Sequence, residues 1–319
     1  MRRSVRAFIG LGANLGEPLT ALRGALAALD ALPGSRLAAV SGLYRSAPIE
    51  SSGPDYLNAV AALDTELEPQ PLLMQLQAIE QSHGRERPYR FAPRTLDLDL
   101  LLFAQQRIDT PTLTVPHPRL HQRAFALLPL LEIEPTLTAP GLGALADAVP
   151  RVADQRIERD PTRLDLRLRP IAERDIDTVI DGWYATNRAA YPYVAEIQRH
   201  THADDARFFR ERLLPSCAVT LACDLTDRAL AFVATESGWV RHLSVFEGER
   251  RRGIGSLLID HAKTRWPGGL RLYTFQRNDA ARAFYARHGF TEVALGVSPA
   301  PESEPDVLLA WPAPTASWP

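Results

Sequence analysis

Two aspartates in the first half of the chain have a spacing suited to metal binding. Asp97 and Asp99 alternate with Leu96, Leu98 and Leu100, so in a strand both carboxylates point to one face, about 6.6 Å apart. Two carboxylates at that separation can hold one or two Mg²⁺ ions, the cations that accompany nucleotide phosphates. Alternating Leu and Asp is also typical of any half-exposed amphipathic strand, so the pair alone leaves both interpretations open.

Four arginines directly precede the carboxylate pair. They are Arg85, Arg87, Arg90 and Arg94. Guanidinium groups beside a metal site can neutralise the charge of a transferring phosphate, and an acidic pair, a metal and arginines are the components of phosphoryl transfer. A solvated, charged surface would have the same composition.

A second set of residues with chemical potential lies in the other half of the chain. It is the run Arg250, Arg251, Arg252, Gly253, Ile254, Gly255 and Ser256, after an expected strand and at the start of an expected helix. Backbone N–H groups at a helix start, aided by the helix dipole, bind a pyrophosphate, and glycines let the backbone approach it closely. A simple helix-entry turn would look the same.

Length and composition limit the classes of protein to consider. A chain of 319 residues with 45% hydrophobic and 23% charged residues is globular and long enough for two domains. The net charge of −2 argues against a general nucleic-acid or membrane-surface binder. Two cysteines are too few for a disulfide scaffold. With a poor signal peptide and no apolar span of about 20 residues, we expect a cytoplasmic protein.

The first half alternates strands and helices that would position the carboxylates. Strands are expected at Ala7–Leu11, Arg36–Tyr44, Asn58–Glu66 and Leu96–Phe103, and helices at Glu17–Leu32, Pro69–Gln81, Arg123–Leu131 and Leu142–Val149. A polar, proline-bounded stretch follows. We therefore expect a first domain over residues 1–155, a linker at 156–162 and a second domain over 163–319.

The second half has its own pattern of elements around the glycine loop. Strands are expected at Leu164–Pro170, Ala218–Asp224, Ala229–Thr235, Val240–Val245, Leu270–Phe275 and Thr291–Val297. Helices are expected at Asp175–Trp183, Ala206–Leu214, Ser256–Arg265 and Asp279–His288. The glycine loop thus falls between a strand and an amphipathic helix.

The first half resembles a known enzyme family. The opening Phe8–Gly16 (FIGLGANLG) and the run Arg90–Leu101 (RFAPRTLDLDLL) are similar to the signatures of 6-hydroxymethyl-7,8-dihydropterin pyrophosphokinase, of the folate pathway. The resemblance implies a ferredoxin-like α/β sandwich. It also implies Mg²⁺-dependent transfer of diphosphate from ATP to the dihydropterin alcohol, giving AMP.

The resemblance also implies roles for individual residues. Asp97 and Asp99 match the Mg²⁺ ligands, and Arg85, Arg94 and His117 the phosphate contacts, with Arg87 and Arg90 on a loop that closes over the reaction. Gln77 and Glu80 match positions near the nucleotide. The pterin site would consist of Ser46, Pro48, Tyr56, Asn58, Arg123 and Phe125. No dedicated base for the substrate alcohol is evident.

The second half resembles the GNAT acetyltransferase superfamily, a mixed α/β fold. The glycine loop and the run Asn278–Phe290 (NDAARAFYARHGF) are similar to the two parts of its acetyl-coenzyme A site. Val245 and the loop Arg250–Ser256 would hold pantetheine and pyrophosphate, and Asn278 would contact the cofactor. Tyr285 would protonate the departing thiolate, although a core aromatic is an equal interpretation.

The resemblances together predict a two-domain α+β, multifunctional enzyme with small-molecule substrates: ATP, a dihydropterin alcohol, acetyl-CoA and an unidentified amine. No nucleic-acid or membrane partner is expected. His242, Glu236 or a water chain could deprotonate the amine. Two alternatives stay open: the second domain is a non-catalytic acyl-CoA-binding or structural module, or the first is a different Mg²⁺/ATP phosphotransferase.

Overall fold

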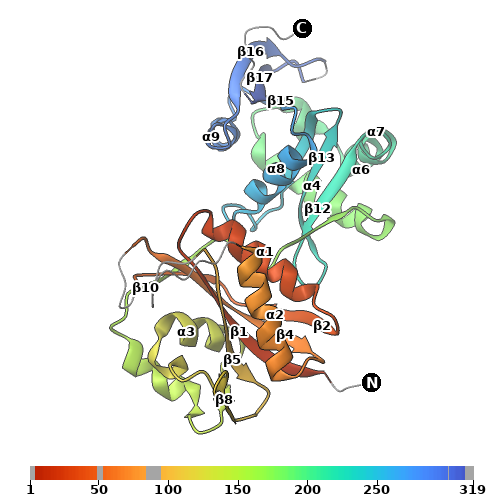
Figure 1. Cartoon of the computed structure of the whole chain (residues 1–319). Helices are drawn as coiled ribbons and strands as arrows, with labels where there is room; N and C mark the ends of the chain where they lie inside the picture. Colours follow the sequence, from red (N-terminus) through yellow and green to blue (C-terminus); the bar gives the residue numbers. More distant parts are fainter. Residues whose placement is uncertain (1–3, 49–52, 84–94, 301, 313–319) are drawn as a thin grey trace. The chain divides into compact units, whose positions relative to one another are not determined.

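The chain forms two structural units, each with its own β-sheet (Figure 1). The computed structural model describes residues 4–48, 53–83, 95–300 and 302–312. The units are Met1–Asp165 and Leu166–Pro319, and each is described by itself. This organisation, with helices and a sheet in each unit, confirms the α+β two-domain architecture expected from the sequence. The finer boundaries at residues 155 and 163 stay a prediction.

The first unit is built around one central strand. β4 (Tyr56–Thr65) is buried along almost its whole length because it has neighbours on both sides and helices on both faces. In order of pairing, the sheet consists of β10 (Ile157–Asp160), β3 (Leu43–Ser46), β4, β1 (Val5–Ala13) and β5 (Asp97–Phe103), and β2 (Ser35–Val40) also pairs with β4. All of these pairs are antiparallel. β5, which carries the two aspartates, pairs only with β1 along this path.

Helices cover the two faces of this sheet unequally (Figure 1). α1 (Pro18–Asp30) and α2 (Pro69–Ser82) begin at prolines, which suit the first helical turn, and bury leucines at helical spacing. They pack with Ile9, Leu98 and Leu100 in one cluster. α3 (Ala124–Ile133) packs with Phe8, Val60 and Leu101 on the other face.

Several shorter elements complete the first unit and revise details of the expected layout. They are β6 (Ile108–Asp109), β7 (Thr114–Val115), η1 (Leu120–Gln122), β8 (Thr138–Ala139), β9 (Gly143–Ala144) and η2 (Leu145–Val152). The expected strand Arg36–Tyr44 is two strands, β2 and β3, which pair with different halves of β4. The expected helix Leu142–Val149 is β9 followed by the 3₁₀ helix η2. The residues of strand β10 fall within the expected linker. They form part of the first sheet because β10 pairs with β3.

The second unit contains a mixed sheet of seven strands. Their order is β11 (Arg167–Pro170), β12 (Ala218–Cys223), β13 (Ala229–Glu236), β14 (Trp239–Val245), β15 (Leu270–Phe275), β17 (Pro305–Trp311) and β16 (Thr291–Val297). β14 and β15 run parallel and share only the pair Trp239↔Arg271, so the sheet opens between them after that point. β17 was missed in the sequence because it enters between two strands that precede it in the chain.

Helices line both faces of the second sheet. α8 (Ile254–Arg265) and α9 (Asp279–Arg287) contribute to one cluster with Leu230 and Val307. α4 (Ile176–Ala190) and the π-helical η4 (Phe209–Leu213) pack on Phe232 in another. The remaining short helices are η3 (Glu173–Asp175), α5 (Ala195–Arg199), α6 (His202–Phe208) and α7 (Leu214–Ser216). Among the described residues, no helix has both the length and the apolarity that crossing a membrane requires.

Candidate active sites

The two aspartates of the first unit lie on the same face of β5, as their spacing predicts. Asp97 and Asp99 are half-exposed, whereas Leu98 and Leu100 between and after them are buried. Their partners across β1 are Gly12 and Gly10. Residues paired across strands point to the same face, and since glycine has no side chain, neither partner on β1 places a side chain directly beside these carboxylates.

Mg²⁺ fits this pair of carboxylates. Within the described residues no group of three or more His, Cys, Asp and Glu side chains is placed to hold a metal. Mg²⁺ does not need such a cage, because it keeps several waters and is bound by one or two carboxylates together with substrate phosphates. Asp97 and Asp99 are therefore a sufficient protein ligand set for this ion.

Asn58 extends the row of the carboxylates to the centre of the sheet. Register places Asn58 opposite Gly12, which in turn lies opposite Asp97. A Cβ atom on Gly12 would lie 3.3 Å from Asn58 Oδ1, so glycine is needed for this close approach. The Asn58 amide donates to Ser46 Oγ at 3.0 Å, and both residues are buried. Two of the predicted pterin residues thus meet in a polar pair beside the predicted metal ligands.

Glu80 contacts the backbone of the carboxylate strand. Its side chain is 1% exposed, and Oε1 accepts a 2.8 Å hydrogen bond from the N–H of Leu98, the residue between Asp97 and Asp99. The α2 carboxylate therefore satisfies a donor of β5 and fixes the strand that bears the two aspartates. Gln77, one turn earlier on α2, is exposed.

His117 lies near Asp97, and a backbone hydrogen bond determines which of its ring nitrogens carries the proton. The backbone N–H of Arg119 donates to His117 Nδ1 at 3.2 Å, so Nδ1 is an acceptor and the neutral ring carries its proton on Nε2. Burial, together with the positive charges of Arg123 and Arg119, lowers the pKa of His117 to about 4, although Asp97 opposes this shift. At neutral pH the ring is an uncharged hydrogen-bond donor.

The start of α3 brings an arginine and an aromatic ring to the same region. The Arg123 guanidinium lies 5.5 Å from the centre of the Phe125 ring. Tyr56, at the start of β4, points to the α3 face because it alternates with Leu57 and shares its face with Asn58. Tyr56 and Phe125 are both half-buried, which leaves part of each ring accessible to a ligand.

Sequence reasoning missed the residue that anchors this turn. Gln155 Oε1 accepts a 2.8 Å hydrogen bond from the N–H of Ala124, and Gln155 Nε2 donates to the carbonyl of Gln122 at the same distance. Both contacts flank Arg123. Because the chain separation is more than 30 residues, nothing in the local sequence indicates this contact.

Some predicted residues of the first unit lie outside the described residues. These are Arg85, Arg87, Arg90 and Arg94, and their roles stay predictions. Pro48 is described as half-buried after β3.

In the second unit the glycine loop lies where β14 and β15 separate. Gly253 is the N-cap of α8 and has a φ of 73°, in the left-handed region that favours glycine. A Cβ atom on Gly255 would lie 3.3 Å from the Phe284 ring, so this glycine allows α8 and α9 to pack closely. Arg251 also has a positive φ, of 61°, although it is not a glycine.

A buried carboxylate holds the loop. Glu249 is 8% exposed and forms ion pairs with Arg252 at 3.0 Å and with Arg228 at 3.1 Å. Arg228 also pairs with Asp224 at 3.1 Å. The Arg252 side chain is thus engaged with Glu249, and this network ties the loop to the β12–β13 turn.

Tyr285 combines a core position with a polar neighbour. Its ring packs 5.4 Å from Phe290 and 5.1 Å from Phe284, as the core interpretation predicts. Burial and the nearby Tyr191 raise the pKa of its hydroxyl, so the phenol keeps its proton at neutral pH. Tyr191 is hydrogen-bonded to the Asn278 side chain, which also caps α9 by accepting from the N–H of Ala281 at 3.1 Å.

The two candidate bases differ in their surroundings. His242, on β14, contacts Trp183 and Phe208 at ring distances of 5.3 and 6.1 Å, and burial lowers its pKa to about 4. A base with that pKa takes a proton from an ammonium only weakly. Glu236 pairs with Arg241 at 2.9 Å beside the β13–β14 turn, at the end of β14 opposite the glycine loop. Neither position favours direct proton abstraction.

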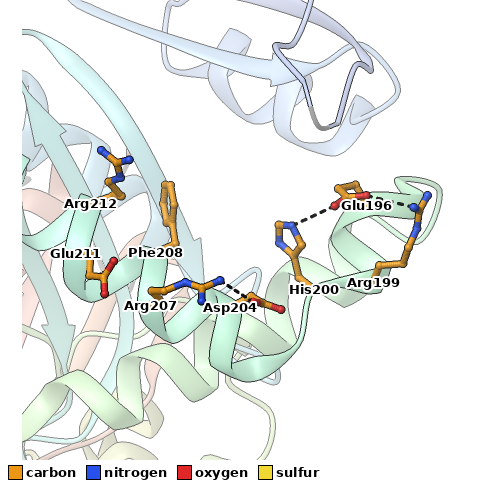
Figure 2. Close-up of a pocket in the computed structure, with 8 residues that line it drawn as sticks. All are labelled: Glu196, Arg199, His200, Asp204, Arg207, Phe208, Glu211 and Arg212. Atoms are coloured by element: carbon orange, nitrogen blue, oxygen red, sulfur yellow. Dashed lines mark hydrogen bonds and ion pairs between the residues drawn. The ribbon is translucent and has the colours of Figure 1, made fainter.

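A pocket of about 500 Å³ adjoins this aromatic cluster (Figure 2). Phe208 lines it and also lies 6.0 Å from Trp183 by ring centres. Its charged side chains pair within the pocket: Arg207 with Asp204 at 2.9 Å, and Arg199 with Glu196 at 3.5 Å. His200 is also part of this lining.

Comparisons with known proteins agree with the two resemblances. Residues 8–135 match the family model of 7,8-dihydro-6-hydroxymethylpterin-pyrophosphokinase. The 2-amino-4-hydroxy-6-hydroxymethyldihydropteridine pyrophosphokinase of Pseudomonas aeruginosa is 46% identical over 157 residues, which cover 49% of this chain and 97% of that protein. Its counterpart in Haemophilus influenzae is 41% identical and covers 48% of this chain and 96% of its own length.

The second unit matches a different family. Residues 217–292 match the model of the acetyltransferase (GNAT) domain. Among solved structures, YjaB from Escherichia coli is 20% identical and covers 47% of this chain and 99% of its own, with a TM-score of 0.41. The chain therefore belongs, through its first unit, to the 7,8-dihydro-6-hydroxymethylpterin-pyrophosphokinase family, and its second unit contains a GNAT acetyltransferase domain.

Proposed function

We propose that the first unit transfers diphosphate from ATP to 6-hydroxymethyl-7,8-dihydropterin, a step of folate biosynthesis. The pterin hydroxyl oxygen attacks the β-phosphorus, the bond from that phosphorus to the α,β-bridging oxygen breaks, AMP leaves, and the hydroxyl proton is lost. The observation that carries this proposal is the proximity of Asp97 and Arg123 to His117, on whose ring both charges act, at the α3 face of the sheet.

Each described residue has a task that its surroundings support. Asp97 and Asp99 would hold Mg²⁺, which when bound offsets the charge of the phosphates. The Nε2–H of His117 donates a hydrogen bond to a phosphate oxygen. Because the ring is uncharged near neutral pH, it adds no charge that varies there. Arg123 supplies a fixed positive charge.

The pterin site uses the other residues of this face. The half-buried rings of Tyr56 and Phe125 stack on the flat pterin. The buried pair of Asn58 and Ser46 forms hydrogen bonds with its polar edge. Arg85, Arg87, Arg90 and Arg94 would close over the phosphates, as the resemblance implies.

Product analysis of metal-ligand variants tests this assignment. Asp97→Asn/Asp99→Asn should lower AMP formation by at least about 10²-fold, since the metal ligands are lost. Asp109→Asn, a matched exposed aspartate of the same unit, should keep the normal rate. Near-normal AMP formation by the double variant would contradict the site assignment, and ADP in place of AMP would favour a different phosphotransferase.

The second unit is proposed to transfer the acetyl group of acetyl-CoA to an amine. The amine nitrogen attacks the thioester carbonyl, the carbon–sulfur bond breaks, the Tyr285 hydroxyl protonates the thiolate, and the ammonium proton leaves through water. The supporting observation is the Tyr285 hydroxyl near the Tyr191–Asn278 pair, where the charge of Arg250 from the glycine loop acts on Tyr191. The pocket of Figure 2 is lined by three carboxylates and also by the arginines Arg199, Arg207 and Arg212, so its charge does not by itself select the acceptor.

Calorimetry and thiol release on the full chain separate catalysis from binding. Tyr285→Phe should leave the Kd of acetyl-CoA unchanged and slow thiol release to a panel of primary amines by about 10²-fold. Tyr273→Phe, an exposed tyrosine on β15, is the matched control. An unchanged rate of thiol release in Tyr285→Phe would contradict the role of Tyr285, whereas acetyl-CoA binding without thiol release in the wild type would favour the non-catalytic alternative.

A further inference from the structure

Ser256, His288 and Asp260 form a chain of contacts at the start of α8. Ser256 Oγ lies 3.0 Å from His288 Nε2, and His288 Nδ1 lies 3.6 Å from Asp260 Oδ1. Ser256 and Asp260 are one turn apart on α8, and His288 comes from the C-cap of α9. The chain therefore links both helices of the proposed donor site.

The same residue types also occur in acyl-transfer triads, but here the geometry differs. In a triad a buried carboxylate hydrogen-bonds to the histidine and fixes its tautomer. The Asp260 side chain is 62% exposed, and 3.6 Å exceeds hydrogen-bond length. The cluster has instead a serine in the expected phosphate loop and an imidazole that can change its charge.

The protonation state of His288 determines what the serine hydroxyl can do. If Nδ1 carries the only proton, Nε2 accepts from Ser256, whose proton then points away from a bound phosphate. If Nε2 carries the only proton, the Nδ1 lone pair faces the Asp260 carboxylate, which is unfavourable. With both nitrogens protonated, Nδ1–H faces Asp260 and Nε2–H donates to Ser256, so the hydroxyl can donate to the phosphate.

Charged groups of both signs surround His288 on α8 and α9. From α8, Lys263 Nζ donates to the His288 carbonyl at 2.6 Å, so its charge is directed to the backbone, and Asp260 is the acidic neighbour of the ring. From α9, Arg287 precedes His288 and is exposed, and the Phe284 ring lies 4.7 Å away.

We propose that His288 and Asp260 are positioning residues for Ser256, and that binding of the diphosphate of the acyl donor is coupled to uptake of a proton by His288. The inference rests on the proposed acetyl-CoA site and adds a regulation by pH. Because the protonated ring leaves the Ser256 hydroxyl free to donate to the phosphate, donor affinity should fall as the pH rises. A charge-assisted hydrogen bond of ordinary strength predicts a change of about threefold to tenfold between pH 6 and pH 8.

Calorimetry of the full chain with acetyl-CoA tests the coupling. Titrations at pH 7.5 in HEPES and in Tris, whose ionisation enthalpies differ, give the number of protons taken up on binding. We expect the wild type to take up a larger fraction of a proton than His288→Gln, which keeps a hydrogen-bond donor without the charge. Protons exchanged by the coenzyme A phosphates cancel in this difference.

Matched variants show which residues cause the proton uptake. His261→Gln changes another histidine, on α8, which contacts Thr220, and should keep the wild-type proton uptake. Asp260→Asn, at an exposed position, should reduce the uptake and provides a second test if His288→Gln is unstable. If acetyl-CoA binds with the same proton uptake in the wild type, His288→Gln and Asp260→Asn, the proton coupling is overturned while the proposed acetyl-CoA site stands. If acetyl-CoA does not bind at any pH, the proposed acetyl-CoA site fails and the inference fails with it.

Discussion

Gln155 accepts a 2.8 Å hydrogen bond from the backbone N–H of Ala124, at the point where α3 begins. Through this contact and its bond to the Gln122 carbonyl, a residue about 30 positions away fixes the turn that carries Arg123. We expect Gln155→Ala to raise the KM for the pterin by about tenfold with a smaller effect on kcat, because two hydrogen bonds of about 1 kcal/mol each are lost.

Steady-state kinetics of AMP formation measure this effect. Gln105→Ala is the matched control, since Gln105 also donates to a backbone carbonyl, that of Thr138 at 3.2 Å, but lies away from Arg123. Equal kinetic changes in both variants would indicate a general loss of stability in place of a positioning effect.

His117 should make the first unit sensitive to acid. Its pKa is lowered on folding, to about 4 from an unfolded value of about 6.5. Its contribution to stability is therefore complete above pH 6.5 and is lost as the pH falls towards 4, because the unfolded state binds the proton first. At pH 5 the loss is at most about 2 kcal/mol, and His117→Asn should abolish it.

The measurement must report on the first unit by itself. All five tryptophans lie in the second half of the sequence, so fluorescence does not follow the first unit. Pulsed hydrogen exchange of β1 and β4 peptides, after equilibration in urea at pH 7 and pH 5, gives its free energy of unfolding. If wild type and His117→Asn lose the same stability, while His121→Asn behaves like the wild type, another group causes the effect.

Glu249→Gln should loosen the loop of the second unit. The substitution removes the carboxylate shared by Arg228 and Arg252, whose side chains are 59% and 45% exposed, so solvent screens much of the lost ion pairing. We expect a loss of about 1 kcal/mol in urea unfolding followed by tryptophan fluorescence. Glu247→Gln, two residues earlier and exposed, should change stability by less than about 0.5 kcal/mol.

Arg251→Gly should have opposite effects on stability and binding. A non-glycine residue at a φ of 61° costs about 1 kcal/mol, which glycine removes, although its more flexible unfolded chain offsets part of the gain. Loss of a guanidinium from the predicted diphosphate site should weaken acetyl-CoA binding by about threefold to fivefold. Thermal unfolding by fluorescence and calorimetric titration measure the two effects, and unchanged affinity would exclude a side-chain contact with the donor.

Local patterns in the sequence determined which residues share a surface within one element. The alternation around Asp97 and Asp99 was sufficient to place both on one face of a strand, because side chains alternate strictly along an extended backbone. Gly253 and Gly255, on either side of Ile254, likewise predicted a loop that opens a helix. Both are consequences of neighbouring residues alone.

Tertiary structure decided which elements meet. The row Asn58, Gly12 and Asp97 depends on the register of three strands, and the insertion of β17 between β15 and β16 depends on the order of a whole sheet. The Ser256–His288 contact depends on how α8 packs against α9. Such contacts join residues far apart in the chain, so their free energies are not encoded in any local periodicity and emerge only when the elements pack.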